Sequence, residues 1–190
     1  ADVRRMLYTM RGRVEAMRAM MFETALQLDL STTGGDAAER ALAREQAQWM
    51  LPICKAFFTA SGFEVANLAV QCFGGHGYVS DAGVEQYVRD LRIASIYEGT
   101  NGIQAFDLVV RKLINDDGRR YAEFVRRIRA DLARLEDRSD LSDIHSAVAD
   151  GLMRLERISA MYLGLAPDSR RDAEAGAAAL ECLCLGARSG

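Results

Sequence analysis

Apolar residues recur at every third or fourth position through most of the chain, which is the spacing of a helix with one buried face. The first such repeat comprises Val3, Met6, Leu7, Met10, Val14, Met17, Met21, Ala25 and Leu28. We predict one long helix here, with this stripe facing the core. Glycine and hydroxyl residues at 31–35 end the helix, and Asp36 can cap the next one.

The same spacing predicts further helices at about 37–73, 83–95, 100–113, 119–137, 141–165 and 171–186. Pro52 lies inside the first of these and is expected to kink or restart it, because proline lacks a backbone donor. Glycine-rich turns at 74–78 and 115–118 separate neighbouring helices. No segment is a convincing β-strand, so the predicted fold is all-α, a bundle of antiparallel helices.

The composition is that of a folded domain, with 49% apolar and 27% charged residues in a chain of 190. The net charge is -3 with acids and bases interleaved, so no basic stripe is available for a nucleic-acid backbone. There is no run of about 18 apolar residues and no signal-like start, and we expect neither a membrane span nor export. The helical pattern is already running at Ala1, which indicates a piece of a larger protein.

The cysteines and histidines do not have the spacing of metal ligands. Cys182 and Cys184 are two residues apart in a segment of helical composition, where they point to different sides, and no second pair completes a tetrahedral site. We interpret these two residues, together with Cys54 and Cys72, as buried or half-buried apolar side chains. No metal site is predicted.

Two junctions between helices combine glycines with polar residues that a bundle core does not require. The first, QCFGGHGY at 71–78, has two interpretations. The glycines can simply end a helix, because glycine tolerates the positive φ found there. Alternatively, the exposed backbone donors of the turn can receive an anion or a pyrophosphate.

The second junction, IYEGTNGIQ at 96–104, carries one carboxylate, Glu98. An acid near a helix N-terminus is stabilised by the helix dipole, and Thr100 or Asn101 can cap the helix that follows. The alternative is that Glu98 is a base that removes a carbon-bound proton, with Gly99 leaving the approach open. Burial would then bring its pKa towards the working range.

Three motifs follow one another in this region: Q-x-x-G-G-x-G-Y at 71–78, V-E-x-x-x-R-D-x-R-I at 84–93 and I-Y-E-G-T at 96–100. With them, residues 71–113 closely resemble the C-terminal helical domain of acyl-CoA dehydrogenases, flavoproteins that desaturate acyl-CoA thioesters. Residues 2–20 resemble the second helix of that bundle. The resemblance implies an incomplete four-helix bundle at 1–115, followed by a helical C-terminal extension at 116–190.

The resemblance also implies roles for individual residues. Glu98 matches the catalytic base that removes the α-proton of the thioester while the β-carbon delivers hydride to FAD, and Gly99 matches a position that leaves room for acyl-CoA. Cofactor contacts are implied for Thr100, Asn101 and Gly102, and, towards the FAD of a neighbouring subunit, for Gln71, Phe73, Gly74 and Gly75. Arg89, Asp90 and Arg92 are expected to form structural ion pairs.

One position departs from the family pattern. Some relatives carry an arginine twelve residues after the catalytic glutamate, in reach of CoA. Here that position is Val110, and the neighbouring Arg111 would point about 100° away on an α-helix.

The partners that the resemblance implies are an acyl-CoA substrate, an electron-transfer flavoprotein and further copies of the same chain. The expected location is the bacterial cytoplasm or the mitochondrial matrix. The domains that hold much of the flavin in the family are absent from these 190 residues. We therefore expect the isolated chain to bind FAD poorly and to turn over nothing.

An alternative is a helical oligomerisation or interaction module of the same fold without dehydrogenase activity, as in nucleic-acid-associated relatives. The unaltered flanks of Glu98 favour the enzyme, and the acidic balance of the chain argues against nucleic acid.

Overall fold

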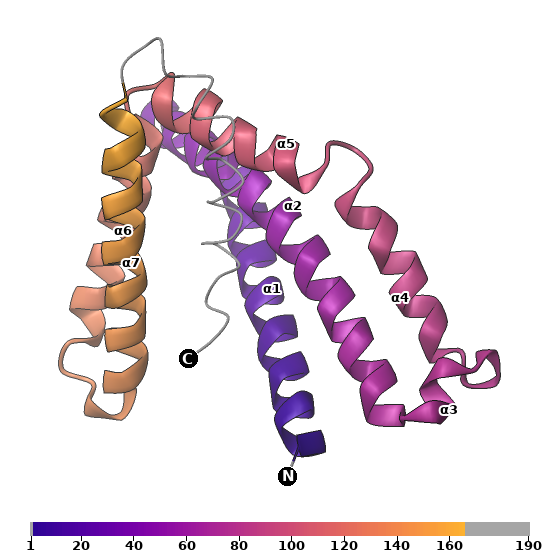
Figure 1. Cartoon of the computed structure of the whole chain (residues 1–190). Coiled ribbons are helices and arrows are strands. Elements are labelled where there is room, and N and C mark those ends of the chain that lie inside the picture. The colour runs from indigo at the N-terminus through magenta and orange to yellow at the C-terminus, as the bar shows by residue number, and fades with distance from the viewer. Residues whose placement is uncertain (1, 166–190) are drawn as a thin grey trace. The chain divides into compact units, whose positions relative to one another are not determined.

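The computed structural model describes residues 2–165 (Figure 1). These residues form helices and include no β-strand, which confirms the all-α prediction. They divide into two compact units, one ending at Ala105 and the other beginning at Phe106. The predicted helix at 171–186 lies outside the described residues, as do Cys182 and Cys184.

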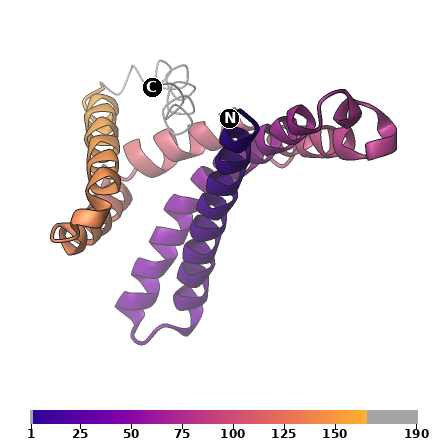
Figure 2. The same cartoon turned by 90° about the horizontal axis from the view of Figure 1, so that it is seen from below.

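The first unit is built on two long antiparallel helices, α1 (Asp2–Thr33) and α2 (Ala37–Phe73), which lie side by side in Figures 1 and 2. Asp36 caps α2 by accepting a hydrogen bond from the Glu39 N–H at 2.8 Å, and the two residues form a capping box. The predicted boundary between the two helices is therefore confirmed. Pro52 is buried inside an unbroken α2, so the helix does not restart there.

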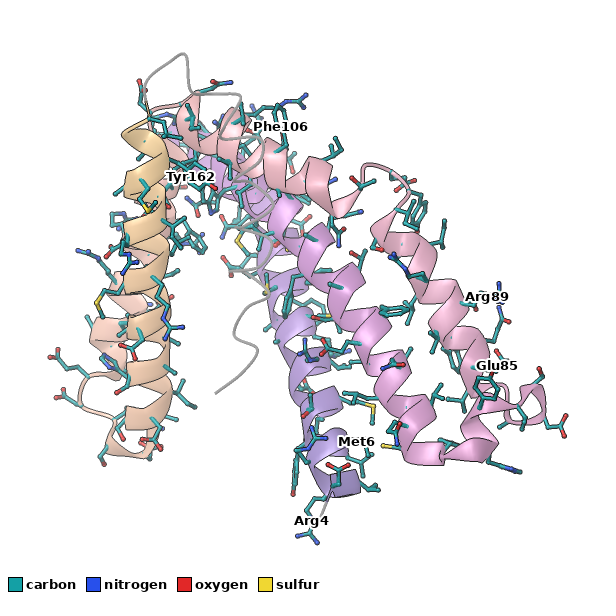
Figure 3. The ribbon with its side chains drawn as sticks, in the orientation of Figure 1. Arg4, Met6, Glu85, Arg89, Phe106 and Tyr162 are labelled. Atoms are coloured by element: carbon teal, nitrogen blue, oxygen red, sulfur yellow. The ribbon has the colours of Figure 1, made fainter. Side chains whose placement is uncertain are left out.

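The apolar stripe predicted to face the core on α1 is mostly exposed in this chain. Met6 is buried against the neighbouring helix (Figure 3), Met10 and Met17 are half-buried, and Val3, Leu7, Val14, Met21, Ala25 and Leu28 are exposed. The buried positions in the second half of α1 are instead polar: Thr24, Gln27 and Ser31. The prediction was wrong here because α1 packs against one long helix, α2, and most of the residues that are buried on α1 do not belong to the apolar stripe.

The remainder of the first unit returns along α2. After α3 (Gly75–Tyr78) and the 3₁₀ turn η1 (Ser80–Ala82), helix α4 (Val84–Arg92) packs against α2 and continues into a second 3₁₀ turn, η2 (Ile93–Ser95). This confirms the helix predicted at 83–95, with its last turn tightened. A loop at 96–100 then leads into α5 (Asn101–Phe106).

Residues Asp107–Ile114, which follow α5 in the chain, form a π-helix, η3, where an α-helix was predicted. A turn of π-helix contains more residues than a turn of α-helix, so successive side chains are rotated by less than 100°. The angle between Val110 and Arg111 is therefore somewhat smaller than the 100° expected for an α-helix. The Arg111 guanidinium lies 3.6 Å from the Asp107 carboxylate and 5.7 Å from the centre of the Phe106 ring.

The second unit contains, besides η3, the helices α6 (Arg119–Leu135) and α7 (Ser142–Leu163) with the 3₁₀ turn η4 (Ser139–Leu141) between them. The predicted break at 115–118 is a turn in which Asp117 and Gly118 have positive φ angles of 52° and 73°. An ion pair of 2.6 Å between Arg129 Nη2 and Glu156 Oε1 joins α6 to α7. This part matches the helices predicted at 119–137 and 141–165.

By length and composition alone, one described helix, α2, could cross a membrane: its most apolar stretch of 18 residues has a mean hydropathy of 1.2, and 17% of that stretch is buried. This is weak support for a span, because a helix of a folded domain meets the same criteria. α2 also packs against α1 and α4.

The cysteines of α2 are placed as predicted. Cys54 is buried and Cys72 is half-buried, both are free thiols, and no group of acidic, histidine and cysteine residues in the described part of the chain could hold a metal ion. The Cys54 Sγ lies 3.3 Å from the Thr24 hydroxyl oxygen on α1. Burial raises the pKa of the Cys54 thiol, and the hydrogen bond with Thr24 lowers it by less.

We expect iodoacetamide to alkylate Cys54 much more slowly than Cys72 in the folded chain at pH 8. A raised pKa leaves less of the reactive thiolate at that pH, and burial restricts access to the sulfur. Mass-spectrometric mapping of the modified peptides over time measures both rates. In 8 M urea the two rates should converge; equal rates in the folded chain would contradict the described burial.

Candidate functional site

The turn that carries Glu98 has an unusual backbone. The N–H groups of Ile96 and Tyr97 both donate to the Ile93 carbonyl, at 2.9 and 3.1 Å, and so close the end of η2. The next two residues, Glu98 and Gly99, both have positive φ angles, of 53° and 87°. The left-handed conformation suits glycine, but at glutamate it costs about 1–3 kcal/mol. Other contacts must therefore hold this turn in place.

Those contacts come from the middle of α2, where Lys55 and Thr59 lie one helical turn apart. The Lys55 Nζ donates to the Gly99 carbonyl at 2.6 Å and to the Asn101 Oδ1 at 3.1 Å. The Thr59 hydroxyl lies 3.1 Å from the same amide oxygen, and the Asn101 Nδ2 donates to the Ala56 carbonyl at 3.4 Å. Asn101 is buried by these contacts. The loop and the first residue of α5 are thus fixed to α2.

Thr100 caps α5, as one of the two interpretations of this junction expects. Its hydroxyl accepts from the Ile103 N–H at 3.3 Å and its carbonyl from the Gln104 N–H at 3.0 Å. The backbone N–H groups of Glu98, Gly99, Asn101 and Gly102 have no acceptor among the described residues. The backbone on both sides of Glu98 and at the start of α5 therefore has free donors, and the carboxylate itself is exposed in this chain rather than buried as the base hypothesis assumed.

The second group of predicted site residues lies at the other end of α4, where α2 meets α3 (Figure 1). Gly74 ends α2 with φ 63° and ψ −146°, a conformation that is essentially limited to glycine, and its N–H donates to the Gln71 carbonyl at 3.1 Å. Gln71, Phe73, Gly74 and Gly75 are all exposed. The helix-ending role of this motif is confirmed, but within one chain these residues are not brought together with Glu98.

The expected ion pairs of α4 are absent from the described residues, although Arg89, Asp90 and Arg92 were predicted to form them. Asp90 accepts a hydrogen bond from Gln86 Nε2 at 2.6 Å, and Arg92 donates to the Ser95 hydroxyl at 2.6 Å while its guanidinium lies 5.8 Å from the centre of the Phe63 ring. Asp90 and Arg92 thus contact uncharged groups on α4, η2 and α2 rather than each other, which the motif alone could not reveal.

A groove of about 790 Å³ runs beside α4. Glu85 and Arg89, which both extend from α4 in Figure 3, contribute to its lining together with Phe63, Arg92 and Ile96. Glu98 and Gly99 do not line it. The groove therefore reaches the beginning of this turn at Ile96 but does not extend to the predicted base.

Sequence analysis missed Lys55 and Thr59. The available signal was weak: two polar residues four positions apart, and so on one helical face, within the largely apolar stretch LPICKAFFTASGF at 51–63. Their partners lie more than 40 residues away along the chain, with separations of 44 and 42 residues. A pattern of local spacing does not specify such a contact.

Comparison with known proteins identifies the family of this helical unit. Residues 1–113 match the family profile described as acyl-CoA dehydrogenase, C-terminal domain. The 3-methylmercaptopropionyl-CoA dehydrogenase of Ruegeria pomeroyi is 44% identical over 136 residues, which cover 70% of this chain and 23% of that protein. A butyryl-CoA dehydrogenase of Syntrophomonas wolfei is 35% identical over 136 residues, covering 72% of this chain and 22% of that protein.

A solved structure, the apo-form of Bd2924, shares the fold with a TM-score of 0.57 at 22% sequence identity, over 92% of this chain and 31% of that one. The chain thus spans less than a third of the proteins it matches. From the matched profile and these relatives, the chain belongs to the acyl-CoA dehydrogenase family and contains its C-terminal domain.

Proposed function

We propose that this chain is the C-terminal part of a FAD-dependent enzyme that introduces a double bond between the α- and β-carbons of acyl-CoA thioesters. The observation that carries the proposal is the Glu98 turn, in which an exposed carboxylate stands on a left-handed backbone, Lys55 binds the carbonyl of the next residue, and the Glu98 and Gly99 N–H groups are free. A helix cap alone would require neither the left-handed backbone at Glu98 nor the bond from Lys55 to the Gly99 carbonyl.

In the proposed reaction, Glu98 takes the proton of the α-carbon as general base. The electrons of the broken α C–H bond form the double bond, and the β-hydrogen leaves as hydride to the FAD, which is the chemistry that the cofactor supplies. Gly99 has no side chain to obstruct the thioester beside the base. A Cβ at Gly99 would lie 3.0 Å from Gln104 Nε2 and 3.6 Å from Ile103 Cγ2, so the position is already closely packed on one side.

The Glu98 backbone N–H is the proposed donor to the thioester oxygen. A hydrogen bond at this oxygen stabilises the negative charge that develops there when the α-proton leaves, and a preorganised donor of this kind is worth roughly 3 kcal/mol. That the N–H has no acceptor among the described residues supports this role.

The residues present fit a flavin nucleotide at two places. The free N–H groups of Asn101 and Gly102, beside the capping hydroxyl of Thr100, form a helix N-terminus that favours phosphate. At the other end of α4, Gln71 and Phe73 are exposed, and no atom lies within 4 Å of a Cβ built on Gly74 or Gly75, so a large ligand can approach this backbone. Because the two places lie apart within one chain, we assign the second to the FAD of a neighbouring copy.

This proposal includes self-association, for which the exposed apolar residues of α1 supply a surface. It also includes an electron-transfer flavoprotein as the electron acceptor, and a location in a bacterial cytoplasm or a mitochondrial matrix. Nucleic acid is not among the proposed partners, since the net charge of the chain is -3.

The test is anaerobic mixing of the purified full-length gene product with a series of acyl-CoA thioesters, including butyryl-CoA and 3-methylmercaptopropionyl-CoA, while the flavin absorbance is followed. Loss of the oxidised flavin band, with a 2-enoyl-CoA as product, supports the proposal. A flavin-loaded protein that no thioester in the series reduces would contradict it.

The 190-residue chain expressed alone is expected to be purified without stoichiometric FAD and to give no acyl-CoA-dependent dye reduction. In the proposed enzyme the chain provides only part of the flavin site, and the matched relatives are more than four times the length of the aligned region. The absorbance ratio at flavin and protein wavelengths measures the loading. Stoichiometric flavin on the isolated chain would show that these helices suffice for the site.

A further inference from the structure

We infer that Lys55 is a positioning residue for the proposed base, because it fixes the carbonyl that follows Glu98 and so holds the carboxylate in its working direction. The effect of Lys55 on the reaction rests on the proposed function. The effect of Lys55 on the conformation of the turn can be tested without any reaction.

The geometry places the Lys55 ammonium on the residue that follows Glu98, the strained residue of the turn. Its Nζ lies 2.6 Å from the Gly99 carbonyl oxygen, and Gly99 is the second of two consecutive residues with positive φ. Rotation of the Glu98–Gly99 segment towards the commoner right-handed conformation would redirect this carbonyl and break the bond. The charged donor therefore opposes the relaxation that the left-handed Glu98 favours on its own.

The second contact of Lys55 connects the turn to the start of α5. The same Nζ lies 3.1 Å from Asn101 Oδ1, and Thr59 approaches that amide oxygen from one turn further along α2. The Asn101 amide oxygen thus has Thr59 as a second possible donor, although the single hydroxyl hydrogen of Thr59 also reaches the Lys55 carbonyl at 2.8 Å. The Gly99 carbonyl accepts from Lys55 alone among the described residues. Loss of Lys55 should therefore free Gly99 and Glu98 more than it frees α5.

A lysine suits this position better than an arginine. An ammonium group directs three donors from a compact centre and can reach two oxygens from different residues, whereas the guanidinium is a longer planar fork. The chain has 24 basic residues, of which only Lys55 and Lys112 are lysines. Lys112 pairs with Asp107 in the second unit, at 2.6 Å, and provides a matched control.

The first measurement is hydrogen–deuterium exchange of the full-length gene product, read in peptides that cover residues 96–104. We expect Lys55→Met to raise exchange of the Ile96 and Tyr97 amides, which donate to the Ile93 carbonyl directly before the turn, at least tenfold, with peptides from α1 unchanged. Lys112→Met should leave this segment as in the wild type. Unchanged exchange in Lys55→Met would overturn the inference.

The second measurement is the rate constant of flavin reduction by acyl-CoA at saturation, in the same proteins with equal flavin content. Lys55→Met should lower it about 10- to 100-fold with little change in KM, since a small displacement of a reacting group acts on the chemical step. Thr59→Val leaves the bond between Lys55 and the Gly99 carbonyl in place, so it should lower the rate constant of flavin reduction much less than Lys55→Met does. Normal reduction by Lys55→Met despite a loosened turn would overturn the positioning role.

Lys55→Arg separates charge from geometry. We expect Lys55→Arg to recover neither the wild-type amide exchange at 96–104 nor the wild-type rate of flavin reduction in full. Complete recovery of both would contradict the requirement for one compact donor that reaches both the Gly99 carbonyl and Asn101 Oδ1. If the wild-type protein reduces no flavin with any thioester, the proposed function fails, and the exchange data alone then decide whether Lys55 holds the turn.

Discussion

Replacing Glu98 by glutamine in the full-length gene product is expected to lower the rate of acyl-CoA-dependent flavin reduction by about 10²- to 10⁴-fold, the usual contribution of a general base. The amide is close in size to the carboxylate and keeps the backbone N–H, so binding and the proposed oxyanion contact should survive. The loss should therefore appear in the rate of reduction at saturating acyl-CoA rather than in the concentration needed for half-saturation. Stopped-flow absorbance of the flavin measures both quantities.

Two further variants make this result interpretable. Glu98→Asp retains a carboxylate on a shorter side chain and should keep part of the activity, because the base is present but displaced. Glu15→Gln removes a carboxylate from the exposed surface of α1 and should be indistinguishable from wild type. If Glu98→Gln also reduces flavin at the wild-type rate, Glu98 is a residue of a helix junction only, and an interaction module of the same fold becomes the better reading.

The helices of this protein could largely be predicted from apolar spacing, since each is long enough to repeat its pattern several times. What that spacing could not give was the direction in which a helix packs. The stripe on α1 is real, yet Thr24, Gln27 and Ser31 take the buried positions beside α2. The π-helix η3 was also missed, because its sequence DLVVRKLI has no residue that excludes an ordinary α-helix.

In the candidate site, too, the sequence predicted features that depend on neighbouring residues but not contacts between residues far apart in the chain. The glycines at 74–78 were expected to end a helix with positive φ, and the φ of 63° at Gly74 confirms this. The positive φ of Gly99 was not predicted, because that glycine was interpreted only as leaving the approach to Glu98 open. The left-handed conformation of Glu98 itself was not predicted, because glutamate has no preference for it. Its support comes from Lys55, 44 residues before the carbonyl it binds, and only the contact of Gly99 and Asn101 with α2 in the folded chain reveals it.

The second large effect is expected from a substitution at Gly77, and it concerns the stability of the fold rather than the reaction. A Cβ built on Gly77 would lie 2.6 Å from the Phe73 Cβ and 2.8 Å from the Val70 carbonyl oxygen, both closer than atoms of these types approach. Neither neighbour can turn away, since one is a Cβ and the other belongs to the backbone of α2. Gly77→Ala should therefore lower the free energy of unfolding by about 3 kcal/mol, the upper part of the range for overpacked interiors.

Gly75→Ala is the matched control, two residues away in the same motif and the same short helix. No atom lies within 4 Å of a Cβ at Gly75 and its φ is not positive, so alanine should be neutral or slightly stabilising there. The stabilities of the two variants can be compared by urea unfolding of the 190-residue chain. The fluorescence of its single tryptophan, Trp49, reports the unfolding. Equal midpoints would mean that the close approach of α3 to the end of α2 is not a feature of the folded chain. A large loss for Gly77→Ala alone would show that this glycine of the motif serves packing, which leaves Gly74 and Gly75 as the ones free to meet a ligand.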